Sequence, residues 1–440
     1  MTPTLSTDTL RQKLAESLHQ PFAGLTARDI RLPGIPGKVL AVVGVRRGGK
    51  TSFMRHHACE KIASGRPSES QLLLSLEDER LFGMTAADLS WLVEEHGRQY
   101  PALLEPGSRT IYLDEVHLVP GWETYVRRLV DEGMREIFVS GSSAKLLSRE
   151  VATSLRGRAL EVLVHPFSFR ECLRHANAEP AQPWAALSPR ERTTLDAALA
   201  RYLQTGGFPE AQQAAPRDHR TLLQSYVDSM LLRDVIERFR VSNTTALTWL
   251  ARALLSAPGG RFTVTRLRNT LKSQGVPVAK ETLEAYLDHL DDAFVVRTIA
   301  MHSTSERQRM VNPRKAYPID PGLIALYSRS DRTYRGASLE TVVLLELERR
   351  GYSVTWVKVG DDREVDFLAE QPGEQPLLVQ VCLDAAADQT WEREVSALAE
   401  AAAQHRKARA IMVTGTSSPP GHGLPKRVEW RSAAEWLLAG

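Results

Sequence analysis

The sequence lacks a long run of uncharged apolar residues, and it contains few cysteines. No stretch of about 18 such residues occurs in the 440-residue chain, so the sequence predicts no membrane-spanning helix and no membrane partner. The amino-terminal segment MTPTLSTDTLRQKL also lacks an apolar signal core, so the expected location is cytoplasmic. Cys59, Cys172 and Cys382 are far apart and have no metal-ligand spacing, which favours reduced thiols over disulfides.

An excess of one charge is also missing. The 56 Lys and Arg residues face 53 Asp and Glu residues, giving a formal net charge of +3. Domains that bind DNA usually carry a local basic stripe, so this small excess is compatible with nucleic acid but does not indicate it. The apolar fraction of 42% is typical of a globular protein, and the length predicts two to four domains.

The most informative feature is a phosphate-loop motif. Residues 38–52 read KVLAVVGVRRGGKTS and contain the pattern G-x-x-x-x-G-K-T. An apolar run at 39–43 predicts a buried strand before the loop, and a helix can begin at Ser52. The glycines allow backbone N–H groups to surround a phosphate, the lysine reaches the β- and γ-phosphates, and the threonine hydroxyl can ligate Mg²⁺. The predicted ATP-binding residues are Gly44, Arg47, Gly48, Gly49, Lys50, Thr51 and Ser52.

A second segment predicts the hydrolytic half of the site. Residues 109–115 read RTIYLDE, a short apolar strand that ends in two carboxylates. Asp114 at the end of a parallel strand can hold Mg²⁺ through its water shell, and Glu115 is then the expected general base that polarises the attacking water. A strand that ends in two exposed acids is the alternative.

Three polar residues farther along are further candidates. The expected strand 136–140 runs into Gly141-Ser142-Ser143, where Ser142 is the first choice for sensing the γ-phosphate and Ser143 the second. Arg156 and Arg158 lie in SLRGR, where oligomeric ATPases often direct an arginine at a neighbour's nucleotide. The choice between the two arginines stays open, and exposed arginines are often only solvated.

Six segments together carry a family resemblance. They are GVRRGGKTS, IYLDEVH, SGSS, LRGR, HPFSFREC at 165–172 and YLQTGGFPE at 202–210. In this order they resemble the prokaryotic AAA+ family ATPases in which a small AAA domain precedes a C-terminal domain of unknown function. The resemblance implies an α/β fold: a five-stranded parallel-sheet AAA+ core at 1–165 and a helical lid at 166–240, followed by a winged-helix module at 241–315 and a restriction-endonuclease-like domain at 316–440.

The middle of the chain predicts three short amphipathic helices and a strand. Leucines at helical spacing mark a helix up to Pro258, Thr263 is a candidate N-cap for a second helix, and a third begins near Lys280. Residues 293–299 read as a strand, which completes the winged-helix plan. The third helix is acidic on its exposed face, so the second helix, with Arg266, Arg268 and Lys272, is the better surface for contact with DNA. A purely structural module is the alternative.

The carboxyl-terminal pattern resembles the restriction-endonuclease-like core. It predicts a helix at 339–350, strands at 352–357, 364–368 and 377–381, and a helix at 391–403. In that core a helix acid, a strand acid and an E-x-K motif form a Mg²⁺ site. Glu340 and Asp366 fit the two acids, but the third element reads Gln380-Val381-Cys382, so the lysine is missing. Lys358 or Arg363 are the cations considered as substitutes, and nuclease activity is not expected.

These patterns lead to one main hypothesis and two rivals. The main hypothesis is an ATP- and Mg²⁺-dependent ATPase that acts on DNA as a homo-oligomer, with a hexameric ring favoured. Branched DNA is a candidate substrate. One rival is an ATP-gated protein-interaction module in a stress or defence system that touches no nucleic acid. The other rival is an ATP-regulated nuclease.

Overall fold

A computed structural model gives the fold, and it divides the chain into two compact units, residues 1–165 and 166–440. Each unit is described by itself. The structure describes residues 3–18, 24–141, 155, 157–303, 305, 308, 313–328, 331–360, 362–384, 388–418 and 423–439. None of the helices in these ranges is long and apolar enough to cross a membrane.

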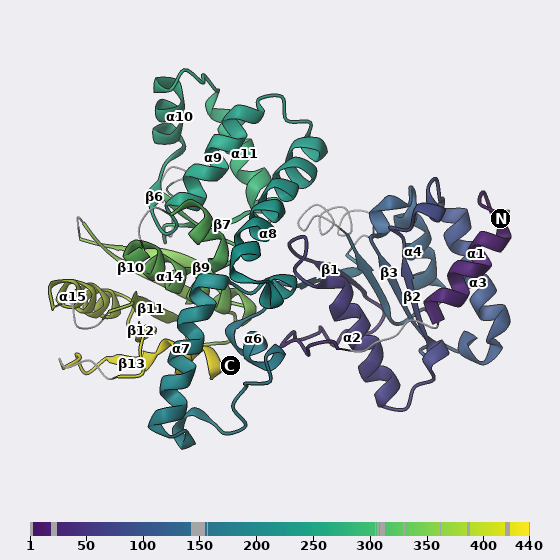
Figure 1. Cartoon of the computed structure of the whole chain (residues 1–440), viewed down its shortest axis with the longest axis horizontal. Coiled ribbons are helices and arrows are strands. Elements are labelled where there is room, and N and C mark those ends of the chain that lie inside the picture. The colour runs from purple at the N-terminus through teal and green to yellow at the C-terminus, as the bar shows by residue number, and fades with distance from the viewer. Residues whose placement is uncertain are drawn as a thin grey trace. The chain divides into compact units, whose positions relative to one another are not determined.

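The first unit contains a five-stranded parallel sheet (Figure 1). Its strand order is β2-β3-β4-β1-β5, and every pair runs parallel. The bounds are β1 Val39–Val43, β2 Gln71–Ser75, β3 Thr110–Asp114, β4 Ile137–Ser140 and β5 Ala159–Leu163. Because the carboxyl ends of parallel strands share one edge, the last residues of β1, β3 and β4 lie at the same edge of the sheet.

Helices cover this sheet and complete its core. They are α1 Thr7–Leu18, α2 Lys50–Ala63, α3 Ala86–Gln99 and α4 Trp122–Asp131, with short turns η1 Ser68–Ser70, η2 Glu79–Leu81, η3 Pro101–Leu104 and η4 Val116–Leu118. Phe53 and Met54 of α2 are buried against Tyr112 and Phe138 of the central strands. Strands that are buried on both faces explain the nearly continuous apolar runs in the sequence.

The second unit begins with a helical segment. It contains α6 Phe169–His175, η5 Trp184–Ala186, α7 Pro189–Thr205, η6 Pro209–Gln213, α8 Pro216–Ser229 and the wide-turn helix η7 Met230–Glu237. The Gly206-Gly207 turn after α7 is filled by a buried carboxylate, because Gly207 N–H donates to Asp320 Oδ2 at 2.6 Å. A Cβ on Gly206 would lie 1.7 Å from Asp320 Oδ1, so the turn requires glycine.

The three predicted helices follow, and the predicted strand is one of three in a small antiparallel sheet. They are α9 Thr244–Ser256, α10 Val264–Ser273 and α11 Lys280–Asp292, with β6 Arg261–Phe262, β7 Val296–Ala300 and β8 Arg314–Pro318 in the order β6-β8-β7. Thr263 caps α10, since its hydroxyl accepts from Arg266 N–H at 3.2 Å. The expected domain boundary after Lys315 falls inside β8.

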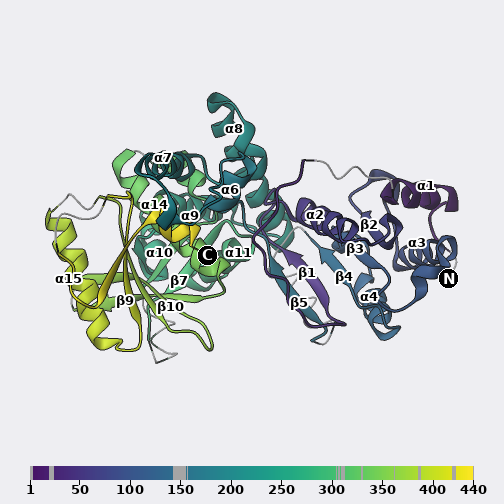
Figure 2. The same ribbon diagram turned by 90° about the horizontal axis from the view of Figure 1, so that it is seen from below.

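The carboxyl-terminal part is a second five-stranded sheet with helices on both faces. It contains η8 Pro321–Leu323, α13 Ile324–Tyr327, α14 Asp331–Arg349, β9 Ser353–Val359, β10 Arg363–Glu370, β11 Leu377–Cys382, α15 Asp388–Gln404, β12 Arg409–Thr414, β13 Val428–Ser432 and α16 Ala433–Leu438. The order is β13-β12-β11-β10-β9, antiparallel from β9 to β11 and parallel from β11 to β13. Figure 2 shows α14 and α15 on opposite sides of this sheet.

One hydrophobic core joins the helical segment to this sheet. Leu195 and Leu199 of α7 belong to the same buried cluster as Val343 of α14, Val379 of β11 and Trp436 of α16. The opposite face of the sheet has a separate core beneath α15. The helices at 166–205 are therefore built into the same folded body as the carboxyl-terminal sheet. Their role as a lid over the nucleotide stays a prediction.

Candidate active site and a second charged cluster

The loop between β1 and α2 has the backbone that a phosphate loop requires. Gly44 has φ 148°, and a Cβ there would lie 2.1 Å from the Val164 carbonyl oxygen, so only glycine fits. Gly49 is left-handed, with φ 99°, immediately before α2 begins at Lys50. The first N–H groups of α2 therefore open onto this loop, as in helices whose amino terminus binds phosphate.

The lysine of the motif is buried at the amino terminus of α2. The Lys50 side chain is 7% exposed, and its Nζ donates to the carbonyl oxygens of Gly44 at 3.0 Å and Val45 at 3.2 Å. Arg28, which sequence reasoning missed, fixes the loop from outside, because its Nη1 donates to Gly48 O at 3.2 Å. No local pattern marks Arg28, since it lies 20 residues before its partner.

The second predicted segment meets the loop. Thr51 Oγ1 donates to Asp114 Oδ2 at 2.8 Å, so the residues predicted as Mg²⁺ ligands lie together although 63 positions separate them. Glu115 follows Asp114 in a left-handed backbone conformation with φ 56°. In the described part of the first unit, the only residues other than glycine with positive φ are Arg47 and Glu115. Such strain concentrates at functional sites.

Ser140 joins the two carboxylate residues, and the sequence analysis did not select it. Its hydroxyl donates to Asp114 Oδ1 and accepts from Glu115 N–H, the latter at 3.0 Å. Ser140 ends β4, which lies between β3 and β1. The sequence does show a small polar residue at the end of an apolar strand. Only the strand order reveals that this residue lies beside Asp114 and Glu115. The preferred Ser142 lies outside the described residues.

The electrostatics of Glu115 suit a proton acceptor. Burial raises the pKa of Glu115 to about 7, with the nearby Asp114 charge acting in the same direction and the Lys50 ammonium opposing it. A general base works best when its pKa is near the working pH. His117 Nδ1 lies 3.3 Å from Glu115 Oε2 and can restrain the carboxylate.

Of the two candidate arginines, the structure describes only Arg158, and it does not place Arg158 beside these residues. Arg156 lies outside the described residues. Arg158 precedes β5 at the amino-terminal edge of the sheet, where its carbonyl oxygen accepts from Val39 N–H at 2.8 Å. Its guanidinium pairs with Asp131 at the end of α4. The strand between Arg158 and the phosphate-loop edge spans about 16 Å, so Arg158 does not contact the phosphate loop of its own chain.

Family models match three successive segments of the chain. A family model described as an AAA domain matches residues 36–173, one described as a domain of unknown function matches 196–333, and one described as a restriction endonuclease matches 332–419. An uncharacterized protein of Methanocaldococcus jannaschii is 32% identical over 379 residues, covering 85% of this chain and 81% of the relative. An uncharacterized protein of Haemophilus influenzae is 30% identical over 353 residues, covering 79% and 82%. The chain belongs to the AAA+ P-loop ATPase family.

Two solved structures are similar to this AAA+ ATPase at low identity. A Walker-type ATPase of Pyrococcus abyssi has 15% identity and a TM-score of 0.40, covering 73% of this chain and 95% of its own. The ORC1 protein of Aeropyrum pernix in complex with DNA has 14% identity and a TM-score of 0.27, covering 79% and 95%.

The AAA+ site suits a hard divalent cation. The Thr51 hydroxyl and the Asp114 carboxylate provide oxygen donors of the kind that Mg²⁺ prefers, on the side of the loop where the helix begins. Few protein ligands are needed, because Mg²⁺ keeps several waters and binds substrate phosphates.

A second charged cluster lies in the restriction-endonuclease-like domain. The register of β10 and β9 shifts between Val365 and Leu368, so a bulge carries Asp366. The acids expected there are Glu340 on α14, which is half-buried, and Asp366 on β10, which is buried. Burial raises the pKa of Glu340 to about 8, and the Asp366 charge adds to the shift. Tyr317 on β8 donates its hydroxyl to Glu340 Oε2 at 3.3 Å.

The expectation that this cluster lacks a lysine is wrong. Lys315 of β8 is 1% exposed, and its Nζ lies 3.3 Å from Asp366 Oδ1 and 2.9 Å from Glu364 Oε1. The two cations considered as substitutes do not supply this charge. Arg363 donates to Ser396 Oγ at 2.7 Å and pairs with Glu400, and the Lys358 side chain is exposed. No local pattern marks Lys315, because β8 was not predicted and lies in a different sheet from Asp366.

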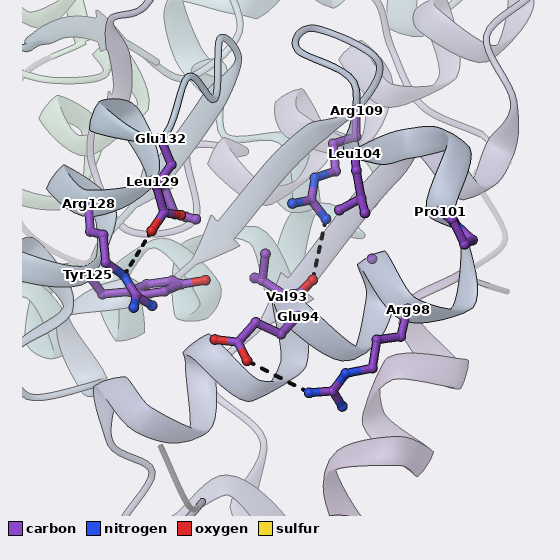
Figure 3. A pocket seen from close by; sticks show the side chains of 11 residues that line it. Val93, Glu94, Arg98, Pro101, Leu104, Arg109, Tyr125, Arg128, Leu129 and Glu132 are labelled. Carbon is purple, nitrogen blue, oxygen red and sulfur yellow. Dashed lines mark hydrogen bonds and ion pairs between the residues drawn. The ribbon is translucent and has the colours of Figure 1, made fainter.

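A pocket of about 530 Å³ opens between α3 and α4 of the first unit (Figure 3). Arg98, Arg109 and Arg128 line it, but each has a partner in the pocket wall: Arg98 pairs with Glu94, Arg109 donates to Val93 O, and Arg128 pairs with Glu132. Arg109 directly precedes β3, whereas Asp114 ends it, so the pocket lies at the edge of the sheet opposite the phosphate loop.

We expect Ser140→Ala to slow ATP hydrolysis while leaving ATP affinity nearly unchanged. The change removes the hydroxyl that links Asp114 to the Glu115 backbone, and losing such a supporting hydrogen bond typically costs about 10–100-fold in activity. Steady-state kcat and nucleotide binding by fluorescence titration measure the two effects separately.

Ser70→Ala is the matched control. Ser70 is also fully buried, but it lies at the start of β2, on the opposite edge of the sheet. Equal losses of kcat in both variants would show that Ser140 matters only for folding.

Proposed function

We propose that the protein is a cytoplasmic, Mg²⁺-dependent ATP hydrolase that works as a homo-oligomer on DNA. The observation that carries the ATPase part is the convergence of Lys50, Thr51, Asp114 and Glu115 at one edge of the sheet, with Ser140 between the two carboxylate residues. Burial of Lys50 and Asp114 makes their charges effective, because a water-excluded site screens them less.

Each residue has a distinct task in this proposal. The N–H groups of the loop and the Lys50 ammonium hold the phosphates, while Thr51 and Asp114 hold Mg²⁺, which neutralises phosphate charge when bound. Glu115 orients the attacking water and accepts its proton. The left-handed backbone and the Ser140 hydrogen bond fix its position.

Arg158 supports an oligomeric mechanism. It lies at the sheet edge opposite the phosphate loop of its own chain, so an arginine finger from this segment has to act on a neighbouring subunit. A closed ring is the assembly in which every subunit both gives and receives such an arginine, and we favour a hexamer.

DNA contact is proposed for the module of α9, α10, α11 and the β6-β8-β7 sheet. The order of these elements is that of a winged helix. Arg266 and Lys272 of α10 are exposed, whereas Glu281, Glu284 and Asp288 form an exposed acidic face on α11. Contact through α10 to the phosphate backbone is therefore favoured over base reading by α11.

Lys50→Ala is expected to abolish ATP binding, whereas Glu115→Gln is expected to keep binding and lose hydrolysis. The lysine contacts phosphate in the ground state, but the carboxylate acts only on the attacking water. Phosphate release and nucleotide affinity are measured for both, with Glu105→Gln, an exposed acid outside the site, as control. Turnover near that of the control in Glu115→Gln would contradict its role.

If Arg156 or Arg158 acts on a neighbouring subunit, changing that arginine to alanine is expected to stop hydrolysis without weakening ATP binding. Mixing the inactive arginine variant with Lys50→Ala protein restores part of the activity, since one mixed interface joins an intact arginine to an intact phosphate loop. Phosphate release against mixing ratio measures the rescue. A protein that stays monomeric with ATP at every concentration rules the mechanism out.

The double variant Arg266→Glu/Lys272→Glu is expected to bind DNA more weakly and with a smaller salt dependence. Each lost phosphate contact lowers the slope of log affinity against log salt by about one. Binding and ATPase stimulation are measured with duplex, forked and four-way DNA.

Lys280→Glu on α11 is the control, because Lys280 already pairs with Glu284 at 3.3 Å. If no DNA changes the ATPase rate and neither variant alters binding, the rival hypothesis of a protein-interaction module replaces this one.

A further inference from the structure

The cluster around Lys315 has the residues of a metal-dependent nuclease site but a different bonding pattern. In the restriction-endonuclease-like core, carboxylates hold a divalent cation that activates water. Here each acceptor atom on Asp366 already has a protein donor. Oδ1 faces Lys315 Nζ, while Oδ2 accepts from Gln380 Nε2 at 2.8 Å and from Val381 N–H at 3.0 Å.

The Gln380 side chain is also hydrogen-bonded in a way that leaves its amide oxygen occupied. Only its carbonyl oxygen is a suitable ligand, and that oxygen accepts from Asp366 N–H at 3.2 Å. Its amide nitrogen donates to Asp366 and, at 2.6 Å, to Glu394 Oε2 on α15. Because the Asp366 and Glu394 carboxylates both accept from the amide nitrogen, they determine the orientation of the Gln380 amide.

Glu364 completes the arrangement from the other side. Its carboxylate lies 2.9 Å from Lys315 Nζ through Oε1 and pairs with Arg261 through Oε2. Arg261 and Lys315 are directly paired residues of β6 and β8, so two neighbouring strands direct their cations at the same acid. Both cations also lie over the Trp356 ring, at 5.3 and 5.8 Å from its centroid.

Lys315 already supplies a positive charge to the carboxylates of this cluster. Burial disfavours the Lys315 ammonium, but the charges of Asp366, Glu340 and Glu364 outweigh that effect and raise the pKa of Lys315. Within the described residues, no group of three or more His, Cys, Asp or Glu side chains is arranged to hold a metal ion.

We propose that the Lys315 ammonium takes the place of the divalent cation in this site. The cluster is then a metal-free ion network that fastens the β6-β8-β7 sheet to the carboxyl-terminal sheet, and it does not cut DNA. The role is independent of ATP hydrolysis. An ammonium is a single charge with three donors, so it satisfies carboxylates that would otherwise require Mg²⁺.

The test measures binding of Mn²⁺ alone, without nucleotide, to the full chain carrying Asp114→Asn, which removes the carboxylate of the phosphate-loop site. Free Mn²⁺ is followed by electron paramagnetic resonance. We expect no bound Mn²⁺ in this parent, and the addition of EDTA leaves its melting temperature unchanged. Adding Lys315→Met leaves the carboxylates without their cation, and we expect it to create one Mn²⁺ site that Asp366→Asn then abolishes.

Arg261→Met is the matched control. It removes a neighbouring cation from the same acid and the same ring, but it leaves Lys315 on Asp366, so it should gain no Mn²⁺ site. The double variant Lys315→Met/Asp366→Asn removes one charge of each sign and preserves the fold if the single variant unfolds.

Two results overturn the proposal. One is Mn²⁺ bound to the parent and released by Asp366→Asn, accompanied by Asp366-dependent nicking of supercoiled plasmid, which would make Lys315 the lysine of an active nuclease. The other is a folded Lys315→Met protein that binds no Mn²⁺. If Lys315→Met does not fold, the Mn²⁺ titration of the Asp114→Asn parent decides the question alone. It shows whether the cluster binds one Mn²⁺ ion or none.

Discussion

The second unit depends on the hydrophobic core that joins α6, α7, α14 and α16 to one face of the carboxyl-terminal sheet. This core fixes α14 against the sheet, and α14 carries Glu340 into an interior that already contains Asp366. Buried carboxylates require partners, since desolvation of an unpaired charge is far more costly than any packing gain. The position of β8, with Lys315 and Tyr317 facing these acids, answers that requirement.

The nucleotide site could be predicted from sequence because its main parts are short contiguous motifs. Gly44 to Thr51 form one contiguous motif that spans the loop and the start of α2, and Asp114 and Glu115 are adjacent at the end of β3, so local patterns are sufficient to find them. Their meeting also follows from a general property of parallel sheets. Ser140 was within an expected strand, but its role depends on β4 lying between β3 and β1, and no local pattern states that order.

Five of the carboxyl-terminal elements were predicted, but β12, β13 and α16 were not, and neither was the chemistry of the charged cluster. Helix and strand periodicity located α14, β9, β10, β11 and α15, and the spacing identified Glu340 and Asp366. The cation comes from 51 residues before Asp366, on a strand of another sheet. Lysine is also a residue that sequence patterns assign to the surface, so an entirely buried Lys315 runs against the usual expectation.

The left-handed backbones of Arg47 and Glu115 have a consequence for how this enzyme unit can be stabilised. For residues with a Cβ this conformation costs about 1–3 kcal/mol each, and glycine would remove most of that cost. Substitution by glycine at either position would therefore raise stability while deleting a side chain to which we assign a role in the proposed ATPase site. A chain selected for thermal endurance alone would lose both residues, so their presence marks where geometry has taken precedence over stability.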